Sequence, residues 1–258
     1  MTAPSDDYGI AGYGSASYGE SFADVYDSWY ENLDDEDFIA YVASSLPPHD
    51  ARILELGVGT GRLIAKLLEL RTEHADIIVG LDASPLMLNH AERRNFPPRV
   101  SLVQSDFSHD IPDMKYDAIF VGYNTLFNLP HRSAIARCFA LLSDRLAPDG
   151  MLHIDAVSPG KNTGGDHIGC KLLANGEKVL SLSSHDIAHQ RITGQFIQFD
   201  ATGHPRYRPW SVHYETPAQL DELAHAAGMR LHCRCGDSVG EPFSETSARH
   251  ISTYVLGQ

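Results

Sequence analysis

Gly57, Gly59 and Gly61 stand at alternate positions after the acidic residue Glu55. The apolar residues just before Glu55 predict a buried strand, and the helical spacing of apolar residues from Leu63 to Leu68 predicts a helix after the turn. Glycines at such a turn remove side chains where a ligand can contact main-chain amides. The segment therefore predicts a binding turn for a small polar ligand.

The residues of this turn also indicate what the ligand lacks. A dinucleotide-binding turn reads G-x-G-x-x-G, and its pyrophosphate lies on the helix N-terminus. Here Arg62 occupies the place of the third glycine. The Glu55 carboxylate would repel a pyrophosphate, whereas it suits a ligand that carries an ammonium group. We therefore expect a ligand without phosphate.

Two further acids follow predicted strands. The segment 76–82 predicts a second buried strand that ends in Asp82, 21 residues beyond Gly61. In doubly wound folds a carboxylate at about this spacing receives ribose hydroxyls, so we expect Asp82 to hold a ribose. A third strand, predicted over 100–104, precedes Asp106, and a fourth is predicted over 116–121.

The pattern E-x-G-x-G-x-G, with these strand ends in order, resembles the first motifs of class I S-adenosylmethionine-dependent methyltransferases. The resemblance implies S-adenosylmethionine as cofactor and S-adenosylhomocysteine as product. It also implies that Asp106 accepts a hydrogen bond from the adenine amino group beside Phe107. We include Ala83, Met87 and Asn124 among the predicted cofactor contacts.

A narrower resemblance concerns the methyl acceptor. Asn124-Thr-Leu-Phe-Asn-Leu129 is similar to the G-N-S-F-x-H-L stretch of glycine-type N-methyltransferases, although Tyr123 replaces its glycine and Asn128 its histidine. With the segments 210–217 and 228–231, the chain resembles bacterial small-molecule N-methyltransferases of the glycine and amino-sugar type and those that finish lincosamide antibiotics. This implies an amine of a natural-product intermediate as acceptor.

The same resemblance implies that Tyr18 and Tyr26 reach the methionine end of the cofactor or the acceptor, so both are also predicted cofactor contacts. We predict Tyr18, Tyr26 and Phe127 as catalytic residues. Tyr18 lies in a Gly-, Ser- and Tyr-rich arm, and Tyr26 opens the stretch Tyr26-Asp-Ser-Trp-Tyr30. Aromatic faces can stabilise a sulfonium by cation–π contact worth about 0.5 to 2 kcal/mol. Trp29 is interpreted as a core anchor, and His131 and His213 are weighed as proton acceptors but not included among the catalytic residues.

The predicted fold class is α/β, with a Rossmann-like, seven-stranded, mostly parallel sheet and helices on both faces. Residues 1–46 are expected to form an arm, mobile without ligand, and lid helices over the cleft. Residues 47–157 form the cofactor-binding core, 158–214 an antiparallel β insertion, and 215–258 complete the sheet. Three strands are predicted in the insertion, over 178–186, 190–200 and 206–214, with a turn at 201–203. The insertion is expected to cover the substrate or to join copies in a homo-oligomer.

Composition favours one enzyme acting on a small molecule. The 258 residues suffice for a full core, and the formal net charge of -14 argues against nucleic acid, whose phosphates need a basic surface. The apolar runs are only strand length, and acids stand where a signal peptide carries cations, so we expect no membrane association and a cytoplasmic location.

No metal is expected. The cysteines Cys138, Cys170, Cys233 and Cys235 lack zinc-site spacing, and the 14 histidines are scattered. Within enzymes, O- or C-methylation and a non-methylating, cofactor-dependent reaction stay open. A regulatory module that binds the cofactor without turnover is the alternative from another class.

Overall fold

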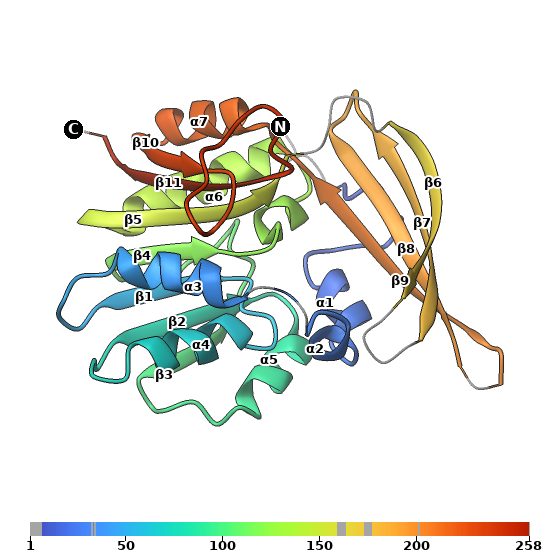
Figure 1. Cartoon of the computed structure of the whole chain (residues 1–258), viewed down its shortest axis with the longest axis horizontal. Helices are drawn as coiled ribbons and strands as arrows, with labels where there is room; N and C mark the ends of the chain where they lie inside the picture. The colour runs from blue at the N-terminus through green and yellow to red at the C-terminus, as the bar shows by residue number, and fades with distance from the viewer. Residues whose placement is uncertain are drawn as a thin grey trace.

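The computed structural model describes residues 7–31, 33, 35–158, 164–172, 177–200 and 202–257. Residues 1–6 of the predicted arm and Ala201 of the predicted turn lie outside the described residues. Two sheets form the framework, a seven-stranded core sheet and a separate four-stranded sheet (Figure 1).

The core sheet has the predicted, mostly parallel architecture. Across the sheet its strands are β10 (Met229–Cys235), β11 (Arg249–Leu256), β5 (Leu146–Val157), β4 (Tyr116–Val121), β1 (Arg52–Leu56), β2 (Ile77–Asp82) and β3 (Val100–Gln104). Only β11 runs antiparallel to its neighbours in this sheet. The strand order places β1 and β4 side by side at the centre, with their carboxyl ends at one edge.

Helices cover both faces of the core sheet, because successive residues of the central strands are apolar on both sides. Ile53 packs in one cluster with α3 (Asp35–Ser44) and α4 (Arg62–Leu70), whereas Leu54 packs in the other with α6 (Arg132–Arg145) and α7 (Pro217–Ala226). The 3₁₀ helix η1 (Thr125–Asn128) follows β4, and α5 (Pro85–Glu92) follows β2. None of the helices in the described part of the chain is long and apolar enough to cross a membrane.

The insertion is an antiparallel sheet of four strands rather than the three predicted. These are β6 (Gly165–Leu172), β7 (Lys178–Asp186), β8 (Arg191–Phe199) and β9 (Pro205–His213), in that order. The prediction missed β6, an edge strand that is exposed at all but one position. Its apolar residues Ile168, Cys170 and Leu172 do alternate, but the run is short and lies between polar residues and glycines.

The lid consists of the short helices α1 (Ser17–Phe22) and α2 (Tyr26–Trp29), which lie between the core and the four-stranded sheet (Figure 1). The prediction that the whole segment up to Leu46 covers the cleft is wrong for α3, since its residues Phe38, Ile39 and Val42 are fully buried against α4 and the sheet. The arm before α1 packs as well, with Tyr8 only 4% exposed. Its mobility stays a prediction.

Candidate active site

The glycine turn after β1 leaves an open place at the edge of the sheet. Gly57 and Gly59 have φ angles of +66° and +55°, values that favour glycine. A Cβ at Gly57 would lie 2.1 Å from the Thr125 methyl carbon, whereas a Cβ at Gly59 would meet no atom nearer than 4.0 Å. Any side chain at Gly59 would therefore enter the space that this turn offers to a ligand.

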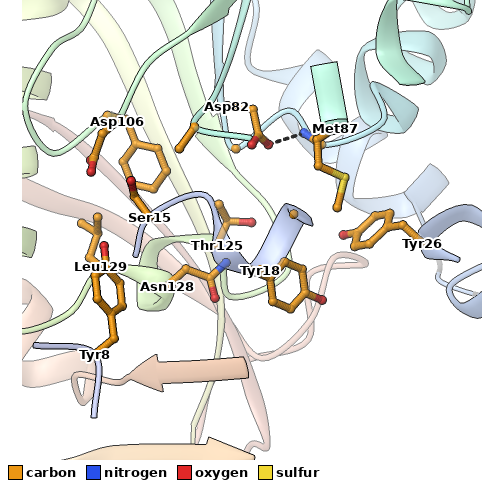
Figure 2. A pocket seen from close by; sticks show the side chains of 15 residues that line it. Tyr8, Ser15, Tyr18, Tyr26, Asp82, Met87, Asp106, Thr125, Asn128 and Leu129 are labelled. Atoms are coloured by element: carbon orange, nitrogen blue, oxygen red, sulfur yellow. Dashed lines mark hydrogen bonds between the residues drawn. The ribbon is translucent and has the colours of Figure 1, made fainter. Parts of the chain in front are cut away.

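Asp82, at the end of β2, is fixed by the same turn. Its carboxylate accepts a hydrogen bond from the Gly59 amide at 2.8 Å (Figure 2). It also accepts one from the Ser84 amide at 2.8 Å. Burial raises the pKa of Asp82 above its ordinary value. Each carboxylate oxygen can accept a further hydrogen bond, as a ribose diol requires.

Asp106 lies in the same pocket, beyond the end of β3. One oxygen of its carboxylate accepts hydrogen bonds from the Ser108 amide at 2.9 Å and the Ser108 hydroxyl at 2.8 Å. Phe107 lines the pocket beside it and is 8% exposed. A fixed carboxylate next to an apolar ring can bind the exocyclic amine and the face of an adenine.

The lid forms the opposite wall of this pocket. Tyr18 and Tyr26 contribute their rings, whose centroids lie 6.4 Å apart (Figure 2). The Tyr18 hydroxyl lies 3.4 Å from that of Tyr30. Burial raises the pKa of Tyr18 well above its ordinary value, so the phenol stays protonated at neutral pH. It can donate a hydrogen bond or present its ring, but it cannot act as a phenolate base.

Close packing brings the lid onto α5. A Cβ at Gly19 of α1 would lie 2.3 Å from the Ser84 Cβ and 2.9 Å from the Met87 Cγ. Ser84 is itself the N-cap of α5, where its hydroxyl accepts from the Met87 amide. Glycine at position 19 therefore permits the approach of the two helices.

Polar contacts hold α2 against the binding turn. Asp27 accepts hydrogen bonds from the Thr60 hydroxyl at 2.5 Å and from Arg94 at 3.0 Å. Arg62 donates to the Tyr30 carbonyl at 3.0 Å. The lid thus contacts the glycine turn directly.

A smaller recess continues from this pocket beneath Tyr26. Its wall includes Glu55, which is 2% exposed, together with Arg62 and Tyr123. The Arg62 guanidinium carbon lies 5.5 Å from the Tyr26 ring centroid and 5.8 Å from that of Tyr123. An acid and a guanidinium in one recess suit a ligand end with both an ammonium and a carboxylate.

The predicted site residues separate into two groups. The pocket and recess bring together Tyr18, Tyr26, Glu55, Gly57, Gly59, Asp82, Ala83, Met87, Asp106 and Phe107. The predicted catalytic role of Phe127 is wrong, because η1 turns its ring into the hydrophobic core, where the residue is 0% exposed.

Gly61 and Asn124 lie outside the lining of the pocket and the recess. Gly61 is the N-cap of α4, and Asn124 accepts a hydrogen bond from the Val157 amide at 2.6 Å. Their cofactor contacts therefore stay a prediction.

Several lining residues were not predicted from the sequence. They are Tyr8, Ser15, Gly19, Val58, Thr60, Arg62, Leu63, Gly122, Tyr123, Thr125, Asn128 and Leu129. Arg62 carried a signal, since it replaces a glycine of the dinucleotide turn, but that replacement was interpreted only as evidence against pyrophosphate. Tyr8 and Ser15 lie in an arm without periodicity, which gives no signal of this kind.

The two histidines weighed as proton acceptors lie elsewhere. His131 is the N-cap of α6, where its ring accepts from the Ala134 amide at 3.1 Å. His213 lies 3.1 Å from the buried Glu215 carboxylate. Both line a separate groove beside Arg132 and Arg191. Their positions support structural roles.

One group of potential metal ligands, Asp50, His74 and Asp76, occurs within the described ranges. The Asp76 carboxylate already pairs with Arg71 at 2.8 Å and accepts from the Ala51 amide at 2.7 Å. This group lies at the amino ends of β1 and β2, at the edge opposite the pocket. The four cysteines are free thiols.

Comparisons with known proteins agree with this architecture. A family model described as a methyltransferase domain matches residues 53–150. The structure of the CcbJ methyltransferase from Streptomyces caelestis superimposes with a TM-score of 0.87, at 28% identity over 95% of this chain and 100% of that one. The sugar N-methyltransferase KedS8 from a Streptoalloteichus species superimposes with a TM-score of 0.69, at 22% identity over 96% of this chain and 99% of that one.

A curated relative extends the likeness at the sequence level. The cypemycin N-terminal methyltransferase of a Streptomyces species is 24% identical over 212 residues, which are 81% of this chain and 84% of that protein. The chain therefore spans most of the length of these methyltransferases, including the inserted sheet.

Proposed function

We propose that this chain, a class I S-adenosylmethionine-dependent methyltransferase, transfers a methyl group to an amine nitrogen of a small molecule, an intermediate of a natural product. The observation that carries the proposal is the pocket in which two fixed carboxylates, Asp82 and Asp106, face two lid tyrosines, Tyr18 and Tyr26. The bound cofactor supplies an electrophilic methyl group on a cationic sulfur.

The residues of the pocket fit a phosphate-free adenosyl ligand. Asp82 accepts hydrogen bonds from two backbone amides, and Asp106 accepts from the Ser108 amide and hydroxyl, with the His109 ring nearby. Two carboxylates in one small pocket would repel a pyrophosphate. Asp82 is proposed to hold the ribose and Asp106 the adenine.

We assign the amino acid end of the cofactor to the recess beneath Tyr26. Glu55 would receive the ammonium group and Arg62 the carboxylate, because the recess places these opposite charges in one wall. Arg62 would then also connect the cofactor to the lid, since it donates to the Tyr30 carbonyl.

The lid favours a small acceptor. It covers the pocket with α1 and α2, and the four-stranded sheet lies behind these helices (Figure 1). Closing such a site excludes water and aligns the reactants. The net charge of -14 disfavours a nucleic acid in the same place.

The chain's own groups would contribute mainly alignment. Tyr18 and Tyr26 line the pocket with aromatic rings, which can stabilise a cation. An acceptor amine must present its lone pair, and desolvation favours its neutral form. The amine proton released on methylation would pass to solvent or to a hydroxyl chain, since no histidine stands among the lining residues given above.

Amine methylation is favoured over O- or C-methylation by the likeness to KedS8, whose name describes a sugar N-methyltransferase. The test is mass spectrometry after incubation with methyl-deuterated cofactor, an amine library and an extract of the host. The expected product carries the label on nitrogen. A label on oxygen or carbon would contradict methylation of an amine. Cofactor binding without acceptor-dependent turnover would favour a regulatory module.

A further inference from the structure

Lys171 places its ammonium group among three aromatic rings. Its Nζ lies 4.5 Å from the Tyr30 ring centroid, 5.7 Å from that of Phe196 and 5.8 Å from that of Trp29. Trp29 and Tyr30 come from the lid, whereas Phe196 and Lys171 come from the four-stranded sheet. We call the three rings the aromatic cage.

The aromatic cage shares a wall with the proposed reaction site. The ring of Tyr30 lies 4.9 Å from that of Tyr26, and its hydroxyl is 3.4 Å from the Tyr18 hydroxyl. Tyr18 and Tyr26 line the cofactor pocket. A group held in the cage is therefore separated from that pocket by one layer of side chains.

The cage holds its cation without a carboxylate. Among the described residues, the Lys171 ammonium contacts the three rings. Asp24, an acid of the lid, instead pairs with Arg206 and Arg208 at 2.7 Å. Burial removes water from the Lys171 ammonium and so lowers its pKa.

This chemistry suits a methylated ammonium better than a lysine. A primary ammonium has three N–H donors that the ring faces cannot satisfy well, whereas a methylated ammonium has fewer donors and a larger apolar surface. Methylated ammonium groups are recognised by aromatic cages in general. The aromatic cage therefore binds the primary ammonium of Lys171 less well than it would bind a methylated ammonium.

We propose that the aromatic cage binds the methylated ammonium group of an acceptor or product, and that Lys171 occupies the cage until such a ligand displaces it. The inference rests on the proposed amine methylation. It adds a second cation site beside the cofactor pocket and a residue that controls access to it.

Intrinsic fluorescence can test this proposal, because the two tryptophans of the chain, Trp29 and Trp210, both belong to the cluster around the cage. The probes are tetramethylammonium and the pair of choline and its uncharged carbon isostere. Lys171→Ala should bind tetramethylammonium and choline at least tenfold more tightly than the parent, with no gain for the isostere. Lys178→Ala, on the neighbouring strand, should behave as the parent.

A second variant tests the contribution of the aromatic rings themselves. Adding Phe196→Leu to Lys171→Ala should remove the gained affinity, while circular dichroism and the melting temperature confirm that the chain is folded. Equal affinities in the parent, Lys171→Ala and Lys178→Ala would overturn the proposal. The readout needs no turnover, so failure of amine methylation in the mass spectrometry assay would be seen separately.

Discussion

The Asp82 carboxylate accepts a hydrogen bond from the Gly59 amide at 2.8 Å, which joins the end of β2 to the turn after β1. This contact orients an acid and a main-chain turn toward one ligand. The neighbouring amide of Val58 donates to the Leu81 carbonyl at 2.7 Å, so the turn is fixed on both sides. The site is therefore formed by the sheet itself, and the lid completes it.

Gly19→Ala should separate the lid from α5, because the new Cβ would lie 2.3 Å from the Ser84 Cβ. We expect at least tenfold lower turnover and faster hydrogen exchange in α1. Gly14→Ala is the matched control, since its Cβ would meet no atom within 4 Å. Parent-like exchange and turnover in Gly19→Ala would show that this approach of the helices is not needed.

Tyr18→Phe should lower turnover more than cofactor affinity, because it removes only the hydroxyl that faces Tyr30. We expect roughly a tenfold loss in kcat, equivalent to about 1.4 kcal/mol, with an unchanged dissociation constant. Tyr207→Phe, which alters an exposed tyrosine of β9, should leave both values unchanged. An unchanged kcat in Tyr18→Phe would show that the Tyr18 hydroxyl has no role in turnover and that Tyr18 serves only as a lid residue.

Arg62→Gln should weaken S-adenosylhomocysteine binding but not the binding of methylthioadenosine, which lacks the amino acid end. We expect about a tenfold loss for the former, because a charge-assisted hydrogen bond contributes about 1.5 to 3 kcal/mol. Calorimetry with both ligands measures the difference. Equal losses for the two ligands would instead indicate that Arg62 acts through the lid carbonyl of Tyr30.

Acidification should destabilise the protein through two buried histidines. Burial lowers the pKa of His153 to about 3 and that of His250 to about 4, from an ordinary value of 6.5. Below pH 6.5 the unfolded chain binds protons that the folded chain does not, so stability present above that pH is lost as the pH falls. Each group contributes a slope of about 1.4 kcal/mol per pH unit within its window.

Urea unfolding between pH 7 and about pH 4 measures this slope. His153→Gln should flatten it, since the ring is held between the Ser45 and Thr253 hydroxyls in the core. The control variant His49→Gln, which replaces an exposed histidine, should leave the slope unchanged. An unchanged slope in His153→Gln would assign the acid sensitivity to other groups.

The central strands could be predicted from the sequence because both of their faces are buried. β4 begins and ends at the predicted residues and is buried at five of its six positions. The edge strand β3 also matches its predicted range, and the acids that end β2 and follow β3 line the pocket. Asp82 and Asp106 were found for this reason. Their spacing along the chain follows from the repeated strand and helix units.

The features that could not be predicted depend on the three-dimensional packing, which a local sequence pattern does not indicate. Gly19 is required by its close approach to Ser84, which lies far along the chain, and β6 is an edge strand without a buried position. Phe127 shows the opposite error. A resemblance placed it at the acceptor, but the left-handed backbone of Asn124, with φ of +64°, starts η1 so that the Phe127 ring enters the core.

The most direct test of the account is calorimetric titration of the parent and Asp82→Asn with S-adenosylhomocysteine. Asp117→Asn is the control, because Asp117 also accepts a backbone amide, that of Arg52, but at the opposite edge of the sheet. We predict single-site binding to the parent and to Asp117→Asn, and a loss of roughly 1.5 to 3 kcal/mol in Asp82→Asn. Absent binding to the parent, or equal affinity in Asp82→Asn, would contradict the account.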